Sequence, residues 1–377
     1  MGKILFLHNS LPEYRIVFME KLSTLTEVIY LITDESKAEK VYGFSGEKSN
    51  VGFKYIIPDV KGYNNIVHFL ENIIINQQIE SIVLPPVDDL LQIIWCKACI
   101  KVSKKYALRS YYWTEKWEPS STLQPFKKKI KNSFQRKLIN YFAKNCTLCI
   151  AAGTRQQIYL ESLNIKRDKI RIAYDSSTSQ TDTKIEIKNE YGIAQNMKII
   201  LYFGRIIERK GLVKLLLSYK TIKKEMPDTC LIVAGEGDDY YLNKCEEIVK
   251  KLQLSDIFFV GKVSPKIRKN YFESSDVFVL PSYTYKGVIE AWGLTVNESL
   301  ECGTPVVSTT AVGAAYDLLN GKNGIMVEEN DVQSLTNGII KILKSNRKDI
   351  ERNCKETYSR FSVNNMAEEF CNILNEN

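Results

Sequence analysis

Short apolar runs alternate with helical patterns along this sequence, and the alternation occurs twice. In the first half the apolar runs are KILFLH, VIYLIT, SIVLPP and TLCIAA, and in the second half they are IILYFGR, CLIVAGEG, DIFFVG, VFVLPS and PVVSTT. Strands that alternate with helices form βαβ units, which build a mostly parallel, doubly wound sheet. The sequence therefore predicts an α/β protein with two doubly wound, Rossmann-like domains.

The two alternating regions are separated by residues 174–184, which are rich in Ser, Thr and Asp and poor in apolar residues. Such a stretch is typical of a domain boundary, and a chain of 377 residues exceeds what one core normally covers. We therefore expect a first domain at 1–175, a second at 185–360, and a final helix at 361–377. Because ligands of doubly wound sheets bind beyond the carboxyl ends of the strands, the two domains should face each other across a cleft.

The composition is that of a soluble globular protein, with 44% apolar and 25% charged residues. No apolar run approaches the roughly 20 residues that span a bilayer, and KILFLH is too short for the core of a signal peptide. The N-terminal MGKILF also lacks the Ser or Thr of a myristoylation signal, so we expect a cytoplasmic location. The net charge of +8 favours an anionic partner, for which nucleotide sugar, nucleic acid and acidic lipid remain open.

Nine cysteines include two Cys-x-x-Cys pairs, Cys96 with Cys99 and Cys146 with Cys149, and this spacing is also found in zinc sites. The first pair lies in a helical pattern and the second in an apolar strand pattern, whereas structural zinc sites favour turns with glycine. In the cytoplasm thiols are expected to be reduced, and a free cysteine commonly serves as a small buried apolar residue. The sequence therefore favours buried thiols over a zinc site.

The stretch PSYTYKGVIEAWGLTVNESLECGTP, residues 281–305, carries two carboxylates after a predicted buried strand. Thr295 and Glu298 stand in the S/T-x-x-E spacing of a helix start, and Gly303 is expected to end that helix. Glu290 lies in the preceding loop. Carboxylates accept hydrogen bonds from hydroxyls and a helix N-terminus attracts phosphate, so the stretch suits a polyhydroxylated, phosphorylated ligand. Alternatively, Glu298 only completes a capping box and Glu290 is a solvated loop charge.

The segment FGRIIERKG, residues 203–211, follows the first strand of the second domain and leads into a helix. Gly204 permits a tight turn, and Arg205 and Lys210 supply two cations that suit two phosphates. The alternative is a pair of solvated surface cations. The nearby AGEGDD lacks the third glycine and the spacing of a dinucleotide-binding fingerprint, which argues against such a cofactor.

EAWGLTVNESLECGTPVV closely resembles the E-x7-E segment of the family 4 retaining glycosyltransferases, also described as glycosyl transferases group 1, which have the GT-B fold. The resemblance implies that Glu290 faces the donor sugar, that Glu298 holds the ribose, and that the backbone of residues 293–294 meets the diphosphate. Trp292 stands where the family more often has Phe, and Asn297 stands where an aliphatic residue is usual.

The same resemblance supplies the rest of the donor site. The family's GR…KG segment places its Arg and Lys on the diphosphate, a role that falls on Arg205 and Lys210, and the family loop that meets the base matches FFVGKV. Glu290, Arg205 and Lys210 are thus the expected catalytic groups, which act by position and charge. The complete expected donor site is Gly204, Arg205, Lys210, Val260, Gly261, Glu290, Trp292, Gly293, Leu294, Thr295 and Glu298.

On the acceptor side the chain departs from the family pattern. Many members carry a Gly-rich loop after the first strand, where this chain has HNSLPEYR, so the side chains of Tyr14 or Arg15 are expected to take part in phosphate binding instead. The family's first-domain histidine is also missing. At its place stands RSYYWTEKWEP, in which Trp113 and Glu115 are candidates for the acceptor pocket, the alternative being a mere strand edge. No catalytic base is assigned.

The resemblance implies a retaining glycosyltransferase of the hexosyltransferase type. It also implies that the final helix, residues 361–377, crosses back to the first domain. The enzyme is expected to move a sugar from a nucleotide diphosphate donor, UDP by family frequency, to a hydroxyl of a glycan or polyprenyl-linked acceptor in surface polysaccharide synthesis, such as that of lipopolysaccharide. No metal or other cofactor is expected, because cations and a helix end neutralise the diphosphate. The alternatives are a GT-B sugar-nucleotide epimerase, which needs no acceptor, and a non-catalytic nucleotide-sugar-binding protein.

Residues 101–144 are strongly basic, with many Lys and Arg but only Glu115 and Glu118 as acidic residues. Aromatic residues are interleaved with this charge. We therefore expect a basic amphipathic helix from Phe126 to Lys144 that binds an anionic membrane surface peripherally, at the inner face of the cell membrane. The alternatives are a solvated helix face and nucleic acid, although no nucleic-acid-binding motif accompanies the charge.

Overall fold

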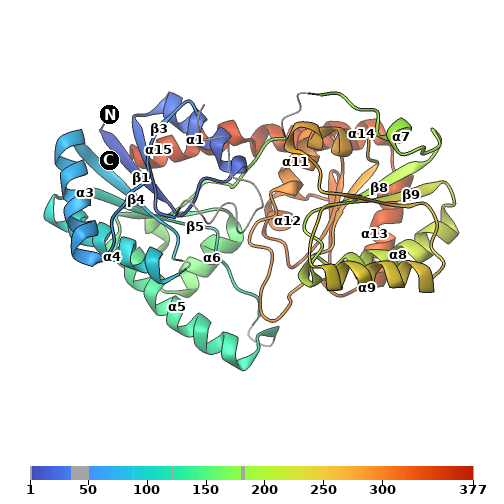
Figure 1. Ribbon diagram of the computed structural model, residues 1–377, viewed down its shortest axis with the longest axis horizontal. Helices are drawn as coiled ribbons and strands as arrows, with labels where there is room; N and C mark the ends of the chain where they lie inside the picture. The colour runs from blue at the N-terminus through green and yellow to red at the C-terminus, as the bar shows by residue number, and fades with distance from the viewer. Residues whose placement is uncertain (1, 35–50, 88, 121–122, 180–182, 377) are drawn as a thin grey trace. The chain divides into compact units, whose positions relative to one another are not determined.

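The structure, a computed structural model, describes residues 2–34, 51–87, 89–120, 123–179 and 183–376. The chain forms two compact units (Figure 1). The first unit comprises Met1–Trp117, Phe126–Ser177 and Val363–Asn377. The second unit comprises Glu118–Pro125 and Thr178–Ser362. The C-terminal segment of the chain thus belongs to the first unit.

The first unit is built on a parallel sheet. Its strands are β1 (Lys3–His8), β2 (Val28–Ile32), β3 (Lys54–Ile56), β4 (Ile79–Leu84), β5 (Arg109–Thr114), β6 (Leu148–Ala151) and β7 (Ile170–Ile172). In the described residues the strand order is β3-β2-β1-β4-β5-β6-β7, with every pair parallel. The order reverses between β1 and β4. In sheets of this kind ligands bind beyond the carboxyl ends of the strands at such a switch point.

Helices cover both faces of this sheet (Figure 1). They are α1 (Glu13–Leu25), α3 (Tyr63–Gln77), α4 (Leu90–Lys105), α5 (Phe126–Asn145), α6 (Thr154–Ser162) and α15 (Val363–Leu374), with a short turn η2 (Arg167–Lys169). On one face α1 packs against α15, and on the other α3 packs against α4, which also contacts α5.

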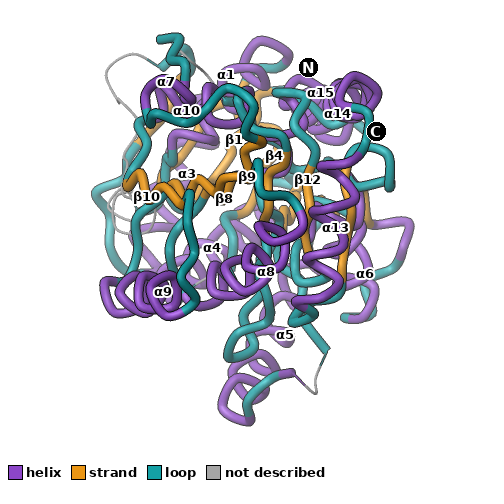
Figure 2. The backbone as a smooth tube through the Cα atoms, turned by 90° about the vertical axis from the view of Figure 1, so that its right-hand side faces the viewer, coloured by secondary structure: helices purple, strands orange, loops and turns teal. Residues whose placement is uncertain are grey.

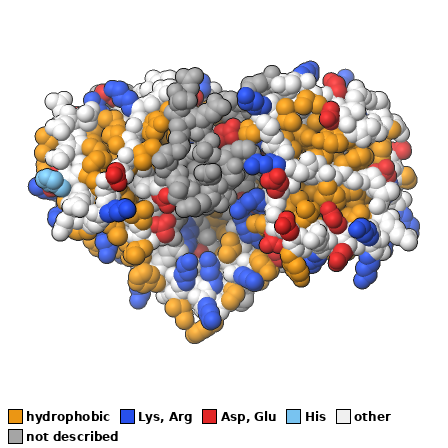
Figure 3. Space-filling view, in the orientation of Figure 1, with side chains coloured by type: hydrophobic (Ala, Val, Ile, Leu, Met, Phe, Trp, Pro, Cys, Tyr) orange, Lys and Arg blue, Asp and Glu red, His pale blue; other side chains and the backbone are white. Residues whose placement is uncertain are grey.

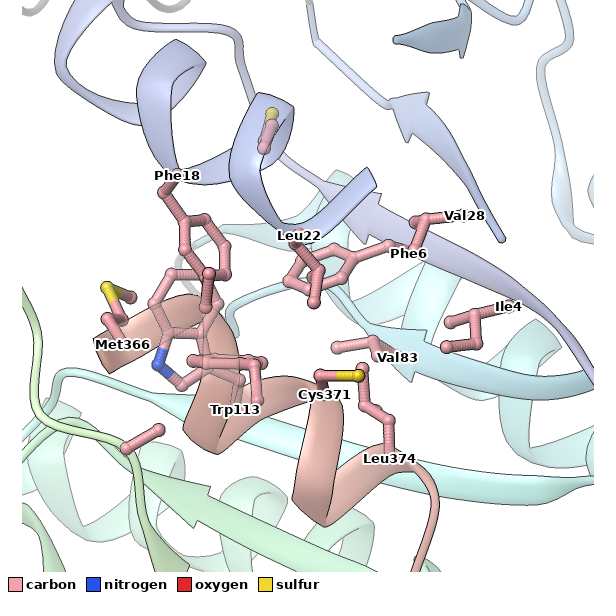
Figure 4. Packing of buried hydrophobic residues seen from close by; sticks show 14 of the residues in the cluster. Ile4, Phe6, Phe18, Leu22, Val28, Val83, Trp113, Met366, Cys371 and Leu374 are labelled. Atoms are coloured by element: carbon pink, nitrogen blue, oxygen red, sulfur yellow. The ribbon is translucent and has the colours of Figure 1, made fainter. Parts of the chain in front are cut away.

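The core beneath α1 and α15 is rich in aromatic rings (Figure 4). The ring centroid of Phe370 in α15 lies 4.9 Å from that of Phe18, 5.2 Å from that of Trp113 and 6.1 Å from that of Phe6. Aromatic pairs at these distances stabilise a core beyond the effect of their burial. Because Phe370 is fully buried among them, α15 completes the core of the first unit although it comes last in the chain.

The second unit repeats the arrangement. Its strands are β8 (Lys198–Phe203), β9 (Thr229–Ala234), β10 (Ile257–Gly261), β11 (Val277–Leu280), β12 (Val306–Thr309) and β13 (Gly324–Val327). In the described residues they form a parallel sheet in the order β10-β9-β8-β11-β12-β13, with its switch point between β8 and β11.

Helices again lie on both faces of the sheet. They are α7 (Ile187–Glu190), α8 (Leu212–Glu225), α9 (Asp239–Lys251), α10 (Arg268–Glu273), α11 (Thr295–Glu301), α12 (Gly313–Leu318), α13 (Val332–Lys344) and α14 (Arg347–Arg360), with short turns η3 (Glu208–Lys210) and η4 (Pro265–Ile267). Figure 2 shows the strands of this unit between a layer that contains α8, α9 and α13 and a layer that contains α7 and α10.

The predicted α/β fold with two doubly wound sheets is confirmed. Helices α7, α12, α13 and α14 and strands β3, β7 and β13 were not predicted. The segment of α14, RKDIERNCKETYSR, has few apolar residues and buries only Ile350, Cys354 and Thr357. The final helix α15 starts two residues later than expected, at Val363. Among the helices of the described residues, none is long and apolar enough to cross a bilayer.

Candidate functional site

The carboxyl ends of β8, β9 and β10 meet at one edge of the second sheet. The backbone N–H of Gly204 donates to the carbonyl of Ala234 at 3.0 Å, and that of Gly235 donates to the carbonyl of Gly261 at 2.8 Å. The expected donor-site residues Gly204, Val260 and Gly261 therefore share this edge. They lie on the β8 side of the switch point, where a ligand is expected.

The turn η3 packs closely against, and is hydrogen-bonded to, the segment that follows β11. Gly211 ends the turn with a φ of +74°, and a Cβ atom there would lie 2.0 Å from the carbonyl oxygen of Pro281. Only glycine suits both the left-handed backbone and this close approach. In addition, the N–H of Tyr283 donates to the carbonyl of Arg209 at 2.9 Å. The loops that follow β8 and β11, on the two sides of the switch point, are thereby held together.

The loop that carries Glu290 is a fixed part of the fold. The N–H of Glu290 donates to the carbonyl of Ala311 at 3.1 Å, and its own carbonyl accepts from the N–H of Gly313 at 3.2 Å. Gly293 then adopts a φ of +100°, where a Cβ atom would lie 2.9 Å from Cγ1 of Val312. Glycine is therefore needed at the turn between this loop and α11.

The Glu290 carboxylate pairs with two cations. Its Oε2 lies 2.7 Å from Nη1 of Arg209 and 2.7 Å from Nζ of Lys210. Burial alone would raise the pKa of Glu290, but Lys210 and Arg209 outweigh burial and lower the pKa to about 2. Burial also lowers the pKa of Lys210, and the pairing with Glu290 opposes that shift. Glu290 is thus not a solvated loop charge, and the cluster has a net positive charge that favours a further anion.

Arg209 is a member of this cluster that the sequence analysis did not name. It named Arg205 and Lys210, but Arg205 is exposed, and Arg209 is the arginine paired with Glu290. Consecutive residues on a long helix point in different directions. For this reason the sequence analysis did not expect Arg209 and Lys210 to contact the same carboxylate. The segment is a single tight turn that ends at Gly211, and both side chains reach Glu290.

The two residues that depart from the family pattern are hydrogen-bonded to each other. The indole N–H of Trp292 donates to Oδ1 of Asn297 at 3.0 Å, and the two side chains are buried. Asn297 also donates from Nδ2 to the carbonyl of Phe361 at 3.4 Å. The bond ties the loop of Glu290 to α11, which carries Glu298. The two departures from the family pattern therefore fit each other, because the buried indole N–H of Trp292 needs an acceptor and Asn297 supplies it.

Replacement of Trp292 by Phe or of Asn297 by Leu should each destabilise the protein by about 1–3 kcal/mol, because each removes one partner of a buried hydrogen bond. The double variant should lose less free energy of unfolding than the sum of the two single losses, because neither partner of the hydrogen bond then remains unsatisfied. Urea unfolding followed by circular dichroism measures the three differences in the free energy of unfolding. Additive losses would show that the bond does not couple the two side chains.

Glu298 is buried, and its Oε1 accepts from Nη1 of Arg268 at 3.0 Å. The capping-box alternative for Glu298 is wrong. The N-cap of α11 is Leu294, which makes no side-chain capping bond, so Thr295 already lies inside the first turn. Arg268 precedes Glu298 by 30 residues, and no spacing rule could have identified it.

In the first unit the four expected acceptor-side residues form one network with Asp175. Arg15 is 0% exposed, and it donates to Asp175 at 2.5 and 2.9 Å and to Glu115 at 2.6 Å. Its guanidinium lies 4.8 Å from the ring centroid of Trp113 and 5.0 Å from that of Tyr14. Burial acts to lower the pKa of Arg15, but Asp175 and Glu115 raise it well above its ordinary value. The guanidinium is therefore a permanent buried cation.

This network corrects two expectations. Arg15 is enclosed with two carboxylates, so it is not available for the phosphate contact expected of it. Glu115 does not belong to an edge strand, because β5 pairs with both β4 and β6. Asp175 was not predicted, since it is 160 residues from Arg15 and lies in the polar stretch that we read as a domain boundary.

No group of three or more His, Cys, Asp or Glu side chains that could hold a metal ion occurs within the described ranges. The cysteines of both Cys-x-x-Cys pairs are buried and present as thiols. Burial raises the pKa of the Cys99 thiol and of the Cys146 thiol, so both remain protonated at neutral pH.

Residues 183–360 match the family described as glycosyl transferases group 1. The chain is 26% identical over 242 residues to an uncharacterized glycosyltransferase of Methanocaldococcus jannaschii, with 61% of this chain and 60% of that protein covered. It is 25% identical over 178 residues to the GDP-mannose-dependent alpha-(1-6)-phosphatidylinositol monomannoside mannosyltransferase of Mycolicibacterium smegmatis, with 46% of each covered. The chain thus spans about half the length of these curated relatives.

Among solved structures, the chain is similar to Anabaena Alr3699/HepE in complex with UDP, with a TM-score of 0.76 and 16% identity. The similarity covers 99% of this chain and 99% of that chain, so it includes both units. At this identity it establishes the fold. The family resemblance inferred from the motifs is confirmed: residues 183–360 match the glycosyl transferases group 1, and the chain has the GT-B fold.

Proposed function

We propose that this chain is a retaining glycosyltransferase of the hexosyltransferase type. It transfers a sugar from a nucleoside diphosphate donor, with UDP as the nucleotide, to a hydroxyl of a glycan or lipid-linked acceptor in the synthesis of a surface polysaccharide. The observation that carries the proposal is the cluster of Glu290, Arg209 and Lys210 at the switch point of the unit that matches the family. In this cluster a carboxylate that can accept hydrogen bonds from sugar hydroxyls lies beside two cations that can bind phosphates.

The cluster suits both the binding and the departure of a diphosphate. In the structure Arg209 and Lys210 share one oxygen of Glu290. A diphosphate competes for these cations through several charged oxygens, and Glu290 then becomes available to a hydroxyl of the sugar. As the sugar leaves, negative charge develops on the diphosphate, and cations that are already in place stabilise it. In this proposal the cations supply the neutralisation for which other transferases use a metal ion, and no cofactor takes part.

The choice of nucleotide and of retention of configuration rests on similarity. The Anabaena structure is a complex with UDP, which supports a UDP donor. The mycobacterial relative is named for GDP-mannose, so GDP donors belong in any test. Retention of configuration is supported by the E-x7-E segment and by the family match.

The exposed face of α5 supports a lipid-linked acceptor. Phe126, Ile130, Phe134 and Tyr141 are 77%, 58%, 64% and 50% exposed. Their spacing returns to the same side of a helix with 3.6 residues per turn, and we call this row of side chains the α5 stripe. In Figure 3 blue and orange side chains are interspersed at the lower end of the view, where α5 lies in Figure 1.

A basic amphipathic helix of this kind lies in a membrane interface with its apolar side down. Lys127, Lys129 and Lys131 are exposed beside the α5 stripe and would meet anionic head groups. The proposed location is therefore the cytoplasmic side of the cell membrane, where the protein binds peripherally and meets a membrane-bound acceptor.

A panel of sugar nucleotides tests the proposal. The purified chain is incubated with UDP-, GDP- and dTDP-linked hexoses, with and without octyl glycosides as acceptors, and the released nucleoside diphosphate and the products are measured. We expect one donor to release its nucleoside diphosphate faster when acceptor is present. The new linkage should keep the anomeric configuration of the donor, and EDTA should not change the rate.

Other outcomes identify the alternatives. An altered sugar nucleotide formed without acceptor would indicate the epimerase, and tight binding without turnover would indicate a binding protein. A product of inverted configuration would refute the retaining mechanism while leaving the transferase assignment intact.

Glu290→Gln should separate the two roles of the cluster. An amide holds Arg209 and Lys210 less strongly than a carboxylate does, so affinity for free nucleoside diphosphate should be unchanged or higher. The contact with the donor sugar weakens, and a hydrogen bond to a charged group contributes about 1.5–3 kcal/mol, so transfer should fall about 10- to 100-fold. Calorimetry and initial rates measure the two quantities. Equal loss of both would point to a folding role for Glu290.

A further inference from the structure

The turn η3 consists of three charged residues of opposite sign. Glu208 comes directly before Arg209 and Lys210, and these two cations contact Oε2 of Glu290. Two cations and one carboxylate leave this cluster with one net positive charge. Opposite charges that are so close along the chain attract each other, and a second carboxylate in the cluster would cancel its charge. The position of Glu208 therefore decides whether the cluster attracts an anion.

The Glu208 carboxylate is bonded to residues outside the turn. Its Oε1 accepts a hydrogen bond from the hydroxyl of Tyr283 at 2.8 Å, and its Oε2 lies 3.3 Å from Nζ of Lys244 in α9. Burial and the bond to Glu208 raise the pKa of Tyr283, so its hydroxyl keeps the proton that it donates. Both oxygens of Glu208 are thus engaged by partners other than the two cations of η3.

Tyr283 is itself held by three different elements. Its backbone N–H donates to the carbonyl of Arg209 in η3 at 2.9 Å, and its ring centroid lies 4.0 Å from Nζ of Lys214 in α8. The next residue, Thr284, donates from Oγ1 to Oε1 of Glu329, which follows β13, at 2.8 Å. The hydroxyl of Tyr283 is therefore offered to Glu208 from a fixed position.

We propose that Tyr283 is a positioning residue of the donor site, because it keeps the Glu208 carboxylate away from the two cations of η3. Arg209 and Lys210 then remain available to the diphosphate of the donor. This inference rests on the proposed glycosyltransferase function and adds to its donor site a residue that acts through another side chain. Cations that are already in place stabilise a departing diphosphate most effectively, and a competing carboxylate in the same turn would weaken them.

The two partners of Glu208 should differ in importance. The side chains of Lys244 and Glu208 are 42% and 30% exposed, and an ion pair with this exposure contributes little. The bond from the hydroxyl of Tyr283 is shorter and comes from a partly buried ring. A neutral donor to a carboxylate forms one of the stronger hydrogen bonds in proteins. Tyr283 is thus the main partner of Glu208, and Lys244 is an auxiliary one.

Two variants of the full chain test the inference. Tyr283→Phe keeps the ring and removes only the hydroxyl, and the double variant Tyr283→Phe with Glu208→Gln also removes the released charge. Calorimetry measures the affinity of each protein for UDP and GDP, with uridine and guanosine as probes that lack the diphosphate. The kcat for transfer is measured with the donor that the unmodified protein uses fastest, and urea unfolding confirms that each variant is folded.

We expect Tyr283→Phe to weaken binding of the preferred nucleoside diphosphate about 10-fold, the scale of one hydrogen bond to a charged group. Binding of the nucleoside should not change, because it has no phosphate for the cations. The double variant should regain the diphosphate affinity of the unmodified protein to within about twofold, since an amide carries no charge that competes for the cations. The kcat should fall in the single variant and recover in the double variant.

Two controls match these variants. Tyr191→Phe removes another tyrosine hydroxyl of the same unit, which lies 2.7 Å from that of Tyr271, and should change neither affinity nor kcat. Lys244→Gln should weaken diphosphate binding less than Tyr283→Phe does. Lys251→Gln makes the same charge change at an exposed position of α9 and should leave binding unchanged.

The outcomes separate this inference from the proposed function. A loss of diphosphate affinity in Tyr283→Phe that the double variant does not recover would assign Tyr283 a structural role and overturn the inference. Unchanged diphosphate affinity in Tyr283→Phe would overturn it as well. Sugar transfer by the unmodified protein tests the proposed function by itself. If the unmodified protein binds UDP or GDP but transfers no sugar, the transferase assignment fails, and the affinities of the variants still decide the role of Tyr283.

Discussion

Lys210→Ala is expected to lower the rate of sugar transfer about 100-fold or more, the effect of removing one preorganised group that stabilises developing negative charge. Lys210 is only 9% exposed and lies 2.7 Å from Glu290, so its ammonium is both positioned and partly desolvated. A charge in such a place acts more strongly on a departing diphosphate than a solvated one. The rate with saturating donor measures the effect, because the loss should appear mainly in kcat.

The effect of Lys210→Ala is compared with the effects of variants at other cationic residues. Arg205→Ala is expected to reduce transfer as well, although the side chain is exposed, and Arg209→Ala should reduce it because Arg209 shares the Glu290 carboxylate with Lys210. Lys220→Ala, on the exposed face of α8, is the matched control and should leave the rate unchanged. Transfer at the unmodified rate by both Lys210→Ala and Arg205→Ala would refute the assignment of the phosphate site.

The sequence predicted the fold well because both doubly wound sheets are buried on their two faces. Most of their strands appear as short apolar runs, whereas β3, β7, β13 and α13 were not predicted. The same physical reason explains the failure at α14. A helix that covers only the outside of a domain needs few apolar residues, and the two apolar residues that α14 buries, Ile350 and Cys354, are too sparse for a periodic signal.

The site was predictable where local sequence determines it. At Gly211 and Gly293 a left-handed backbone and a close contact exclude any other residue, and such a requirement for glycine can be recognised in the sequence. Charged residues that become partners only through the fold cannot be recognised in this way. Arg268 reaches Glu298 across 30 residues, and Arg15 reaches Asp175 across 160 residues. Charged residues are common in every loop, so nothing local distinguishes these from solvated ones.

Replacement of Lys127, Lys128, Lys129 and Lys131 by Glu should abolish binding to anionic liposomes at low salt. Each Lys near an anionic surface contributes about 1 kcal/mol, so loss of four corresponds to about 4 kcal/mol, or roughly a 1,000-fold weaker partition before the added repulsion is counted. The α5 stripe should also be needed, because charge alone is screened within about 10 Å at 0.1 M salt. Phe126→Ser with Phe134→Ser should therefore weaken the binding that persists at high salt.

Sedimentation with vesicles of phosphatidylglycerol and phosphatidylcholine, at low and high salt, measures these effects. The matched control carries the same charge change on the second unit, at the exposed residues Lys220, Lys341, Lys344 and Lys348. If net charge alone governed binding, this control would lose as much affinity as the α5 variant. If α5 lies in the interface, the control keeps most of its binding, because its altered residues do not accompany an apolar stripe. Unmodified protein that does not pellet at low salt, or an α5 variant that pellets fully, would contradict the membrane assignment.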